Sequence, residues 1–361
     1  MRSERGQVLP LVAGLIVVLL GMTALAVDIG GFVAHRRSLQ NAADAMALAA
    51  AQELADPVTS SVRQAVIDRA TQWGEKNGID PDEIEEIRVI PKSGQNPNPE
   101  VQVRIREDHR FVFARAIGIT SHDVTASAGA IKTTPGGTSG VVPWALLNSE
   151  VQGAIPGALV TLKYDANNPM TGNFGPIRID GSGSGNCGQS DKYCSGVKYG
   201  SDSTICSQAA VSAGTCQENA PECSGASCQT QPGNVVGATR QAVDWRLAKT
   251  DPACDAFGEV FSDPDGDHVY QIAQQCNPFI PGSKSSERVV IIPLISNFGP
   301  GSQPVTITGF VLAFLEGYDA GKCQGNACEI KARFVQAELT TGALTGVYDE
   351  DALLKFVRLV E

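Results

Sequence analysis

The chain has 361 residues, which is longer than one hydrophobic core usually supports, so we expect two folded lobes in addition to any membrane segment. Its formal net charge is −11 at pH 7, from 28 basic and 39 acidic side chains. This balance argues against a nucleic-acid partner, because neutralising phosphates requires a clustered Lys/Arg surface and the sequence contains no such cluster.

The first predicted element is a membrane-spanning helix. Val8–Val27 is apolar without interruption and contains no charged residue. About twenty helical residues are needed to cross a hydrocarbon core of roughly 30 Å. The sequence therefore predicts a cytoplasmic tail at 1–7 and a transmembrane helix at 8–28, with Asp28 reaching interfacial water at the outer boundary.

A cleaved signal peptide is the alternative. Arg2 and Arg5 form a basic region before the apolar run, and Ala24-Leu25-Ala26 has the small-x-small form of a cleavage site. Against cleavage, the run is longer than the apolar part of a typical signal peptide, and helix-favouring sequence continues through Ile29 and Val33. We favour a retained anchor, and the sequence leaves cleavage open.

A long helix is predicted to continue the anchor. Strong helix formers dominate Ala34–Leu54 and stop before Asp56-Pro57, with Gly30-Gly31 as a place for a kink. Small residues on one face permit close approach by another helix. These residues are Ala42, Ala43, Ala45, Ala49 and Ala50. The sequence leaves open whether this face packs on the chain's own ectodomain or on a partner subunit.

The rest of the first lobe, within 29–132, alternates between helix and strand patterns. An amphipathic helix is predicted to end near Asn77-Gly78, with Val66 and Ala70 on its apolar face. It is followed by two predicted strands, a short helix and a third strand, which are EIRVI, EVQVRIRE, HRFVFARAIG and His122–Lys132. This order predicts a small sheet packed against helices.

The second lobe, 141–361, is predicted to be rich in strands. The preceding segment, 133–140, is polar and rich in turn formers, which predicts a linker. The predicted strands are VVPWALL, ALVTLKY, RVVIIPLI, VTITGFVLAFLEGY and CEIKARFVQAEL. One helix is predicted, at Ala238–Ala248, and Gly181–Gln231 is too polar to bury a core. The predicted class is α+β: one transmembrane helix extending into an Ala-rich helix, a small α/β lobe, and a β-rich lobe.

All ten cysteines lie in the second lobe, and their even number predicts disulfides. No CxxC occurs, whereas metal ligands usually stand in close Cys or His pairs. The disulfide candidates are Cys187, Cys194, Cys206, Cys216, Cys223, Cys228, Cys254, Cys276, Cys323 and Cys328. Because disulfides persist in oxidising compartments, we expect the N-terminus to be cytoplasmic and the bulk of the chain extracytoplasmic. The spacing leaves the connectivity open.

The sequence predicts no catalytic residues, no cofactor and no metal site. Its four histidines form no HExxH, and no GxSxG nucleophile motif occurs. Asp263–Asp267 places carboxylates at alternate positions around a turn, as a Ca²⁺ loop does, but without EF-hand spacing. A polar surface turn is the favoured interpretation of that loop.

The N-terminal region resembles that of TadE/TadG-like Flp pilus-assembly proteins. The resemblance is carried by Arg5-Gly6-Gln7, the apolar run, Ala26-Val27-Asp28 and Arg37–Ala51. Further segments resemble parts of the ectodomains of such proteins: Gly172–Ile177, Pro232–Gly237, Arg288–Pro293 and Gly309-Phe310. The resemblance implies a non-catalytic structural or assembly component of a Tad (Flp) pilus system in the bacterial cytoplasmic membrane. Its implied partners are the lipid bilayer and pilus-assembly or other envelope proteins.

Two features bear on what the resemblance implies. Leu11 stands five residues after Gly6, where prepilin-like substrates carry Glu, so we do not expect processing after Gly6.

TadG-like proteins often carry a von Willebrand factor A domain with an Asp-x-Ser-x-Ser metal site, and Asp180-Gly-Ser-Gly-Ser184 fits that string. A Gly/Cys loop follows it instead of a helix, which favours a chance match. The alternative function is a surface binding or adhesion module that holds a divalent metal at Asp180, Ser182 and Ser184 or at Asp263–Asp267.

Overall fold

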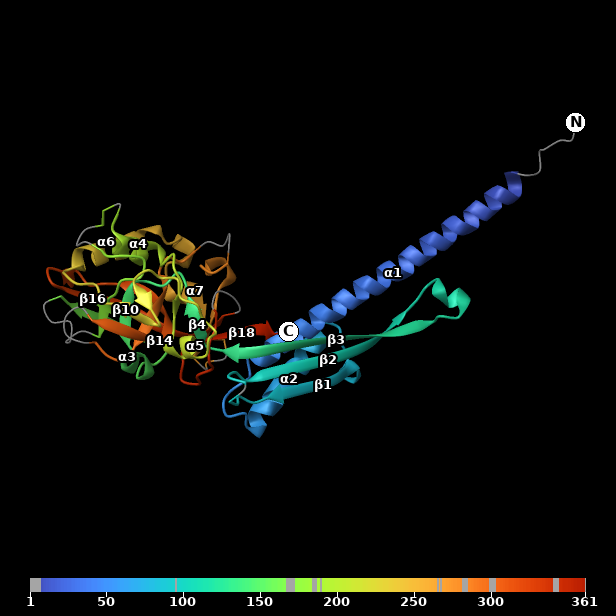
Figure 1. Ribbon diagram of the computed structural model, residues 1–361, viewed down its shortest axis with the longest axis horizontal. Helices are drawn as coiled ribbons and strands as arrows, with labels where there is room; N and C mark the ends of the chain where they lie inside the picture. Colours follow the sequence, from blue (N-terminus) through green and yellow to red (C-terminus); the bar gives the residue numbers. More distant parts are fainter. Residues whose placement is uncertain are drawn as a thin grey trace, which may run out of the picture. The chain divides into compact units, whose positions relative to one another are not determined.

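The computed structural model describes residues 8–94, 96–166, 173–183, 187–188, 190–264, 266, 268–280, 285–298, 303–339 and 344–360. The chain divides into two compact units (Figure 1). The first comprises Met1–Ile131 and Leu359–Glu361, and the second comprises Lys132–Arg358. The predicted α+β class is confirmed, with a long apolar N-terminal helix and five disulfides in the β-rich C-terminal region.

The first unit is organised around one long helix, α1 (Val8–Ala51), which runs for 44 residues. Gly30 and Gly31 lie inside it, so the helix continues through the place where we expected a kink. Its N-terminal part carries exposed apolar side chains, and its C-terminal part is buried. In Figure 1 the blue N-terminal part of α1 extends beyond the strands of its own unit.

The buried part of α1 packs on α2 (Ser60–Lys76) and on the sheet. Thr59 caps α2 by accepting a hydrogen bond from the backbone N–H of Val62 at 3.3 Å. A Cβ built on Gly74 would lie 3.1 Å from Cε of Met46, so the glycine permits a close helix crossing. The predicted small-residue face packs within its own unit. Ala42, Ala43, Ala49 and Ala50 are buried there, and Ala45 is half-buried.

Three antiparallel strands, β1 (Ile84–Ile90), β2 (Glu100–Arg110) and β3 (Ser121–Thr133), form the sheet of this unit. Val101, Val103 and Ile105 of β2 are buried and the residues between them are exposed, as expected for a strand with one face on helices. Between β2 and β3 the chain forms one 3-10 turn, η2 (Ala114–Ile117). The predicted short helix at 109–118 is therefore reduced to this turn, since its first two residues continue β2. A further 3-10 turn, η1 (Pro81–Glu83), precedes β1.

The second unit is built on a mixed sheet with the strand order β18-β16-β14-β13-β5-β7. Strands β13, β14 and β16 are antiparallel neighbours, while β5 pairs in parallel with β13, and β12 and β18 pair in parallel with β16. The bounds are β5 (Trp144–Leu147), β6 (Leu159–Asp165), β7 (Phe174–Pro176), β12 (Val269–Ile272), β13 (Val289–Ile295), β14 (Pro304–Gly317), β16 (Ala327–Leu339) and β18 (Leu354–Val360). Strand β13 is buried at every position, as expected of a central strand.

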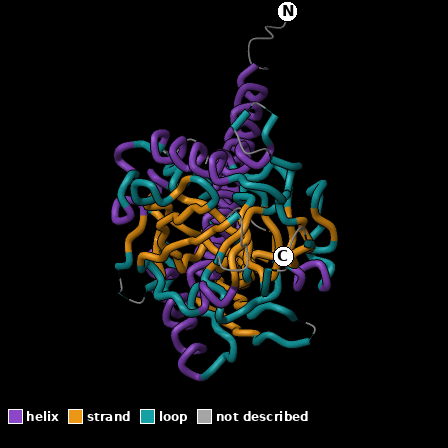
Figure 2. Tube along the Cα trace, turned by 90° about the vertical axis from the view of Figure 1, so that its left-hand side faces the viewer, coloured by secondary structure: helices purple, strands orange, loops and turns teal. Residues whose placement is uncertain are grey.

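Short elements complete the second unit. In Figure 2 the strands of the second unit (orange) occupy the middle of the view. The short strands are β4 (Pro135–Thr138), β8 (Ile205–Cys206), β9 (Cys223–Ser224), β10 (Ser227–Gln229), β11 (Phe261–Ser262), β15 (Cys323–Gln324) and β17 (Leu344–Thr345). The helices are α3 (Asn148–Gln152), α4 (Lys192–Tyr199), α5 (Gln208–Ser212), α6 (Val236–Lys249) and α7 (Phe257–Val260), with 3-10 turns η4 (Pro252–Cys254) and η5 (Gln274–Cys276).

Helices α4 and α6 pack against each other over one face of the sheet (Figure 1). Tyr193 and Val197 of α4 join the same apolar core as Val243 of α6. We expected the segment Gly181–Gln231 to be too polar to bury a core, and that prediction was wrong, because Tyr193 and Val197 lie in this segment. Asp191 caps α4 by accepting a hydrogen bond from the backbone N–H of Cys194 at 2.9 Å, so a short helix forms in a sequence of low average hydrophobicity.

The segment 133–140 is largely interior instead of an exposed linker. All four residues of β4 are buried, and β4 pairs with β8 and β17. A Cβ built on Gly137 would lie 2.2 Å from Sγ of Cys216 and 2.8 Å from the carbonyl oxygen of Ile205. Close packing therefore requires glycine at position 137. In the sequence this glycine was interpreted as part of a linker.

The ten cysteines form five disulfides, and no cysteine is free. Each bond joins partners that follow one another among the cysteines in sequence. The pairs are Cys187–Cys194, Cys206–Cys216, Cys223–Cys228, Cys254–Cys276 and Cys323–Cys328. The bonds therefore stabilise local loops, and none joins distant parts of the second unit.

Candidate membrane anchor

The apolar surface of α1 is the largest exposed feature of the first unit. Its large apolar side chains from Leu11 to Val27 are 47–74% exposed. Apolar surface costs about 25 cal/mol for each Å² that is exposed to water. A continuous apolar surface of this kind is therefore more stable in lipid or against another protein than in water. Among the described residues, one helix, Gly14–Ala51, is long and apolar enough by length and composition to cross a membrane. A signal sequence near the N-terminus passes the same test of length and composition.

Asp28 lies at the end of this surface and is 6% exposed. Its carboxylate accepts hydrogen bonds from the backbone N–H groups of Val112 at 2.9 Å, Phe113 at 3.1 Å and Ala114 at 2.7 Å. These N–H groups lie at the start of the turn η2. N–H groups at the start of a helical turn have no partner within the turn, so they favour binding of a carboxylate. Asp28 is thus a cap for the hairpin tip, instead of the interfacial, water-facing carboxylate that we expected.

A cluster of aromatic and histidine rings follows Asp28 along α1. The ring of Phe32 lies 5.7 Å from that of His109 and 5.8 Å from that of His122. The rings of His35 and His109 are 5.0 Å apart, and Nε2 of His35 lies 3.5 Å from a carboxylate oxygen of Glu107. Three of the four histidines therefore meet where the hairpin β2–β3 packs on α1, a grouping that the sequence alone did not indicate.

The two loops that the alternative function would use as metal sites bind backbone N–H groups with their described carboxylates. Asp180 accepts hydrogen bonds from the N–H groups of Asp202 at 2.9 Å and Ser203 at 3.2 Å. Asp263 accepts from those of Gly266 at 2.8 Å and His268 at 3.1 Å. Asp180 thereby binds a segment that lies 22 residues further along the chain, whereas Asp263 binds the backbone of its own loop. Ser184, Asp265 and Asp267 lie outside the described residues.

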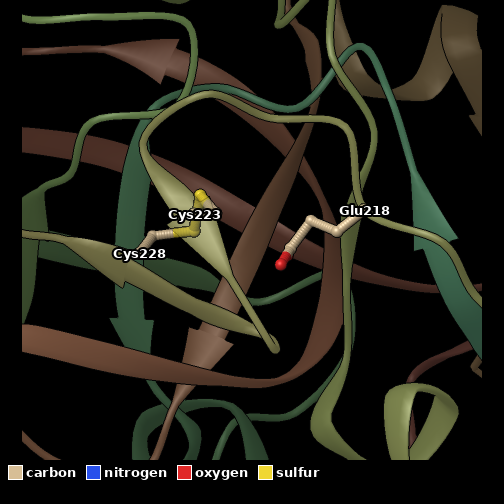
Figure 3. A group of neighbouring side chains, drawn as sticks. All are labelled: Glu218, Cys223 and Cys228. Carbon is tan, nitrogen blue, oxygen red and sulfur yellow. A yellow bond between two sulfur atoms is a disulfide. The ribbon is translucent and has the colours of Figure 1, made fainter.

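Glu218, Cys223 and Cys228 place their ligand-type atoms within 4.8 Å of one another (Figure 3). The two sulfurs are joined at 2.02 Å, and a disulfide lacks the thiolate that binds metals. Glu218 accepts hydrogen bonds from the N–H groups of Cys206 and Ala226, both at 3.2 Å. These contacts give the group a structural role, which is to hold the hairpin β9–β10 in place.

A cavity of about 260 Å³ lies in the second unit beside α3. Among the described residues that line it, acidic groups come from Asp349 and Asp351, and there is no histidine, cysteine, lysine or arginine. Ser207 also lines it, and its hydroxyl caps α5 by accepting from the N–H of Ala210.

Comparison with curated proteins found no significant match, and neither did comparison with solved structures. The match to a known family lies in the N-terminal region and covers the whole of α1. Residues 6–53 of this chain match the family model described as Tad, a putative Flp pilus-assembly TadE/G-like family, which confirms the resemblance found in the sequence.

Proposed function

We propose that this chain is a single-pass, membrane-anchored envelope protein and a non-catalytic structural or assembly component of a Tad (Flp) pilus system. One observation carries the proposal: the region of family similarity, 6–53, coincides with α1, Val8–Ala51. The similarity therefore covers both the exposed apolar part of the helix and the part that packs in the first unit.

In the proposed topology residues 1–7 are cytoplasmic and the chain after Asp28 is extracytoplasmic. The five disulfides support this orientation, because disulfides persist where thiols are oxidised. The lipid bilayer is then the first partner of the chain. The small-residue face of α1 is buried in its own unit, so a pilus partner is expected to contact the exposed part of α1 or the surfaces of the two units.

Fractionation of the native bacterium tests the anchor. The full chain is expected in the membrane fraction and to resist alkaline extraction, because about twenty apolar residues hold it in lipid. Protease added to spheroplasts is expected to digest both units and to spare the N-terminal helix. N-terminal sequencing is decisive, since mature protein that begins near Val27 would show that the segment is a cleaved signal.

Photocrosslinking in the native bacterium tests the assembly role. A crosslinking residue at Leu20 or Leu25, both exposed on α1, is expected to capture a pilus-system component of the membrane. The same residue at Tyr199, which is 66% exposed in the second unit, reports contacts outside the membrane. A deletion strain with a normal number of pili, together with no captured pilus component at any of these positions, would contradict the role.

A further inference from the structure

We propose that the tip of the β2–β3 hairpin, Phe111–Ile119, inserts into the interfacial layer of the phospholipid membrane that α1 crosses. The first unit would then contact the membrane at two adjacent places, the helix and the tip. This inference rests on the proposed anchoring by α1, and the experiment below separates the failure of one from the failure of the other.

The tip carries apolar side chains that the protein leaves uncovered. Val112 is 67% exposed, Phe113 48% and Ile119 50%. Within the described part of residues 8–131, every other large exposed apolar side chain lies on α1, between Leu11 and Val33. The exposed apolar surface of the unit is therefore confined to the candidate anchor and to this one tip, which is the distribution expected of a membrane-facing side.

The structure fixes the tip beside the anchor. Residues nearer the hairpin tip contact residues of α1 that lie nearer its apolar N-terminal part. Glu107 lies beside His35, His109 packs on Phe32, and the tip is hydrogen-bonded to Asp28. Figure 1 shows this hairpin alongside α1.

The helix on either side of this attachment is itself apolar and exposed. Val27 is 49% exposed and Ile29 is 52% exposed. Depth in the membrane is set by α1, so Asp28 holds the tip at a level where the helix already presents apolar side chains.

Most backbone N–H groups of the tip are hydrogen-bonded within the protein, so the tip can enter a medium that contains little water. An unsatisfied N–H group in lipid costs several kcal/mol, which usually excludes loops from membranes. Asp28 accepts from three consecutive N–H groups of the tip, and turn hydrogen bonds satisfy others. The N–H groups with partners are those of Phe111, Val112, Phe113, Ala114, Ala116, Gly118 and Ile119. Burial of the tip therefore leaves few donors without acceptors.

Charge at the tip favours a phospholipid surface over a purely apolar partner. Arg110 precedes the apolar side chains, with its side chain 85% exposed, and Arg115 is exposed within the turn. Arginine beside apolar side chains suits the membrane interface, because the stem lies in the acyl region and the guanidinium reaches phosphate. Nε of Arg110 also lies 3.9 Å from a carboxylate oxygen of Asp108, and an exposed ion pair of this kind contributes little to stability.

Depth-dependent quenching in liposomes of phosphatidylcholine and phosphatidylglycerol tests the inference. The full-length protein carries an NBD label at an introduced cysteine, at Val112, at Leu20 on the anchor, or at exposed Glu86 on β1. Spin-labelled lipids are expected to quench the labels at Leu20 and Val112, and iodide in the water is expected to quench the label at Glu86.

Each outcome has one interpretation. If lipids quench Leu20 while Val112 behaves like Glu86, the anchor holds and the tip inference is overturned. If lipids quench neither Leu20 nor Val112, the anchoring itself fails. A Val112 label that is shielded from iodide and not quenched by lipids indicates a protein contact and also overturns the inference.

A variant of the tip provides the matched control. The triple substitution V112S/F113S/I119S keeps the Asp28 cap, because the cap uses backbone N–H groups. With the label at Ala116, lipid quenching is expected in the wild-type background and is expected to be lost in the triple variant. Quenching of a label at Leu20 in both backgrounds confirms that the variant is folded and inserted, and unchanged quenching at Ala116 would overturn the inference.

Discussion

The indole N–H of Trp144 donates a hydrogen bond to the hydroxyl of Tyr193 at 3.0 Å, in a core where the two side chains are 0% and 2% exposed. The same hydroxyl is 2.7 Å from Oγ1 of Thr239 on α6. Burial raises the pKa of Tyr193, so the hydroxyl stays protonated and available to this network. The contact joins a sheet strand, α4 and α6 through one oxygen atom.

Removing that oxygen by Tyr193→Phe is expected to destabilise the second unit. The indole N–H of Trp144 would lose its acceptor, and a buried unsatisfied donor costs about 1–3 kcal/mol of unfolding free energy. Urea unfolding of the detergent-solubilised protein measures the change. Tyr199→Phe is the control, since Tyr199 is 66% exposed and its change is expected to be within about 0.5 kcal/mol. Equal stability of the two variants would argue against the network.

The cap at Asp28 makes a second prediction, on the hairpin tip. Asp28→Ala leaves the N–H groups of Val112, Phe113 and Ala114 without their acceptor, so amide hydrogen exchange in the tip is expected to accelerate. Asp28→Asn retains one acceptor oxygen and is expected to lie between wild type and Asp28→Ala. The control is Asp68→Ala, because Asp68 is exposed on α2 and its carboxylate accepts a hydrogen bond from the side chain of Gln64, on the same helix. Unchanged exchange in Asp28→Ala would show that the cap does not hold the tip.

Local patterns in the sequence were sufficient for the elements that depend on near neighbours. A continuous apolar run predicted the first half of α1, and alternation predicted β1 and β2, because a strand with one buried face has a period of two. The even number of cysteines in one region predicted disulfides, and the structure contains five. Their connectivity depends on which loops close in space, and the spacing left it open.

The contacts that the sequence did not predict join distant segments. The amide of Phe113 that binds Asp28 lies 85 residues further along the chain, and no local pattern links the two. Tyr193 lies in a segment rich in Gly and Ser, where average polarity conceals a short helix with a buried face. Gly137 is a turn former by composition, yet its role is to admit Cys216 at close range. In each case the deciding partner is far away in sequence.

Disulfide removal is expected to depend on loop length. Cys254–Cys276 closes a loop with a sequence separation of 22, and Cys323–Cys328 one of 5. Loop-closure entropy predicts a loss of about 3 kcal/mol for the double alanine variant of the first pair and about 2 kcal/mol for the second. All four cysteines are buried to a similar extent, so the packing losses should be comparable. Urea unfolding of both variants provides the measurement, and a larger loss for the short loop would contradict the entropic explanation.

Met22 and Met46 lie on the same helix, α1, one in its exposed N-terminal half and the other in its buried C-terminal half. Met46 is 0% exposed and faces Gly74 of α2, whereas Met22 is 66% exposed. Met46→Ala opens a cavity between α1 and α2 and is expected to lower the unfolding free energy of the first unit by about 2–5 kcal/mol.

Met22→Ala removes a side chain that contacts solvent or lipid, and the expected change is about 0.5 kcal/mol or less. Thermal unfolding in detergent, followed by circular dichroism, compares the two variants. A large loss in Met22→Ala with little change in Met46→Ala would mean that the apolar half of α1, rather than its C-terminal half, forms part of the folded core. The proposed anchor would then lose its physical basis, because a helix buried in protein has no apolar face to place in lipid.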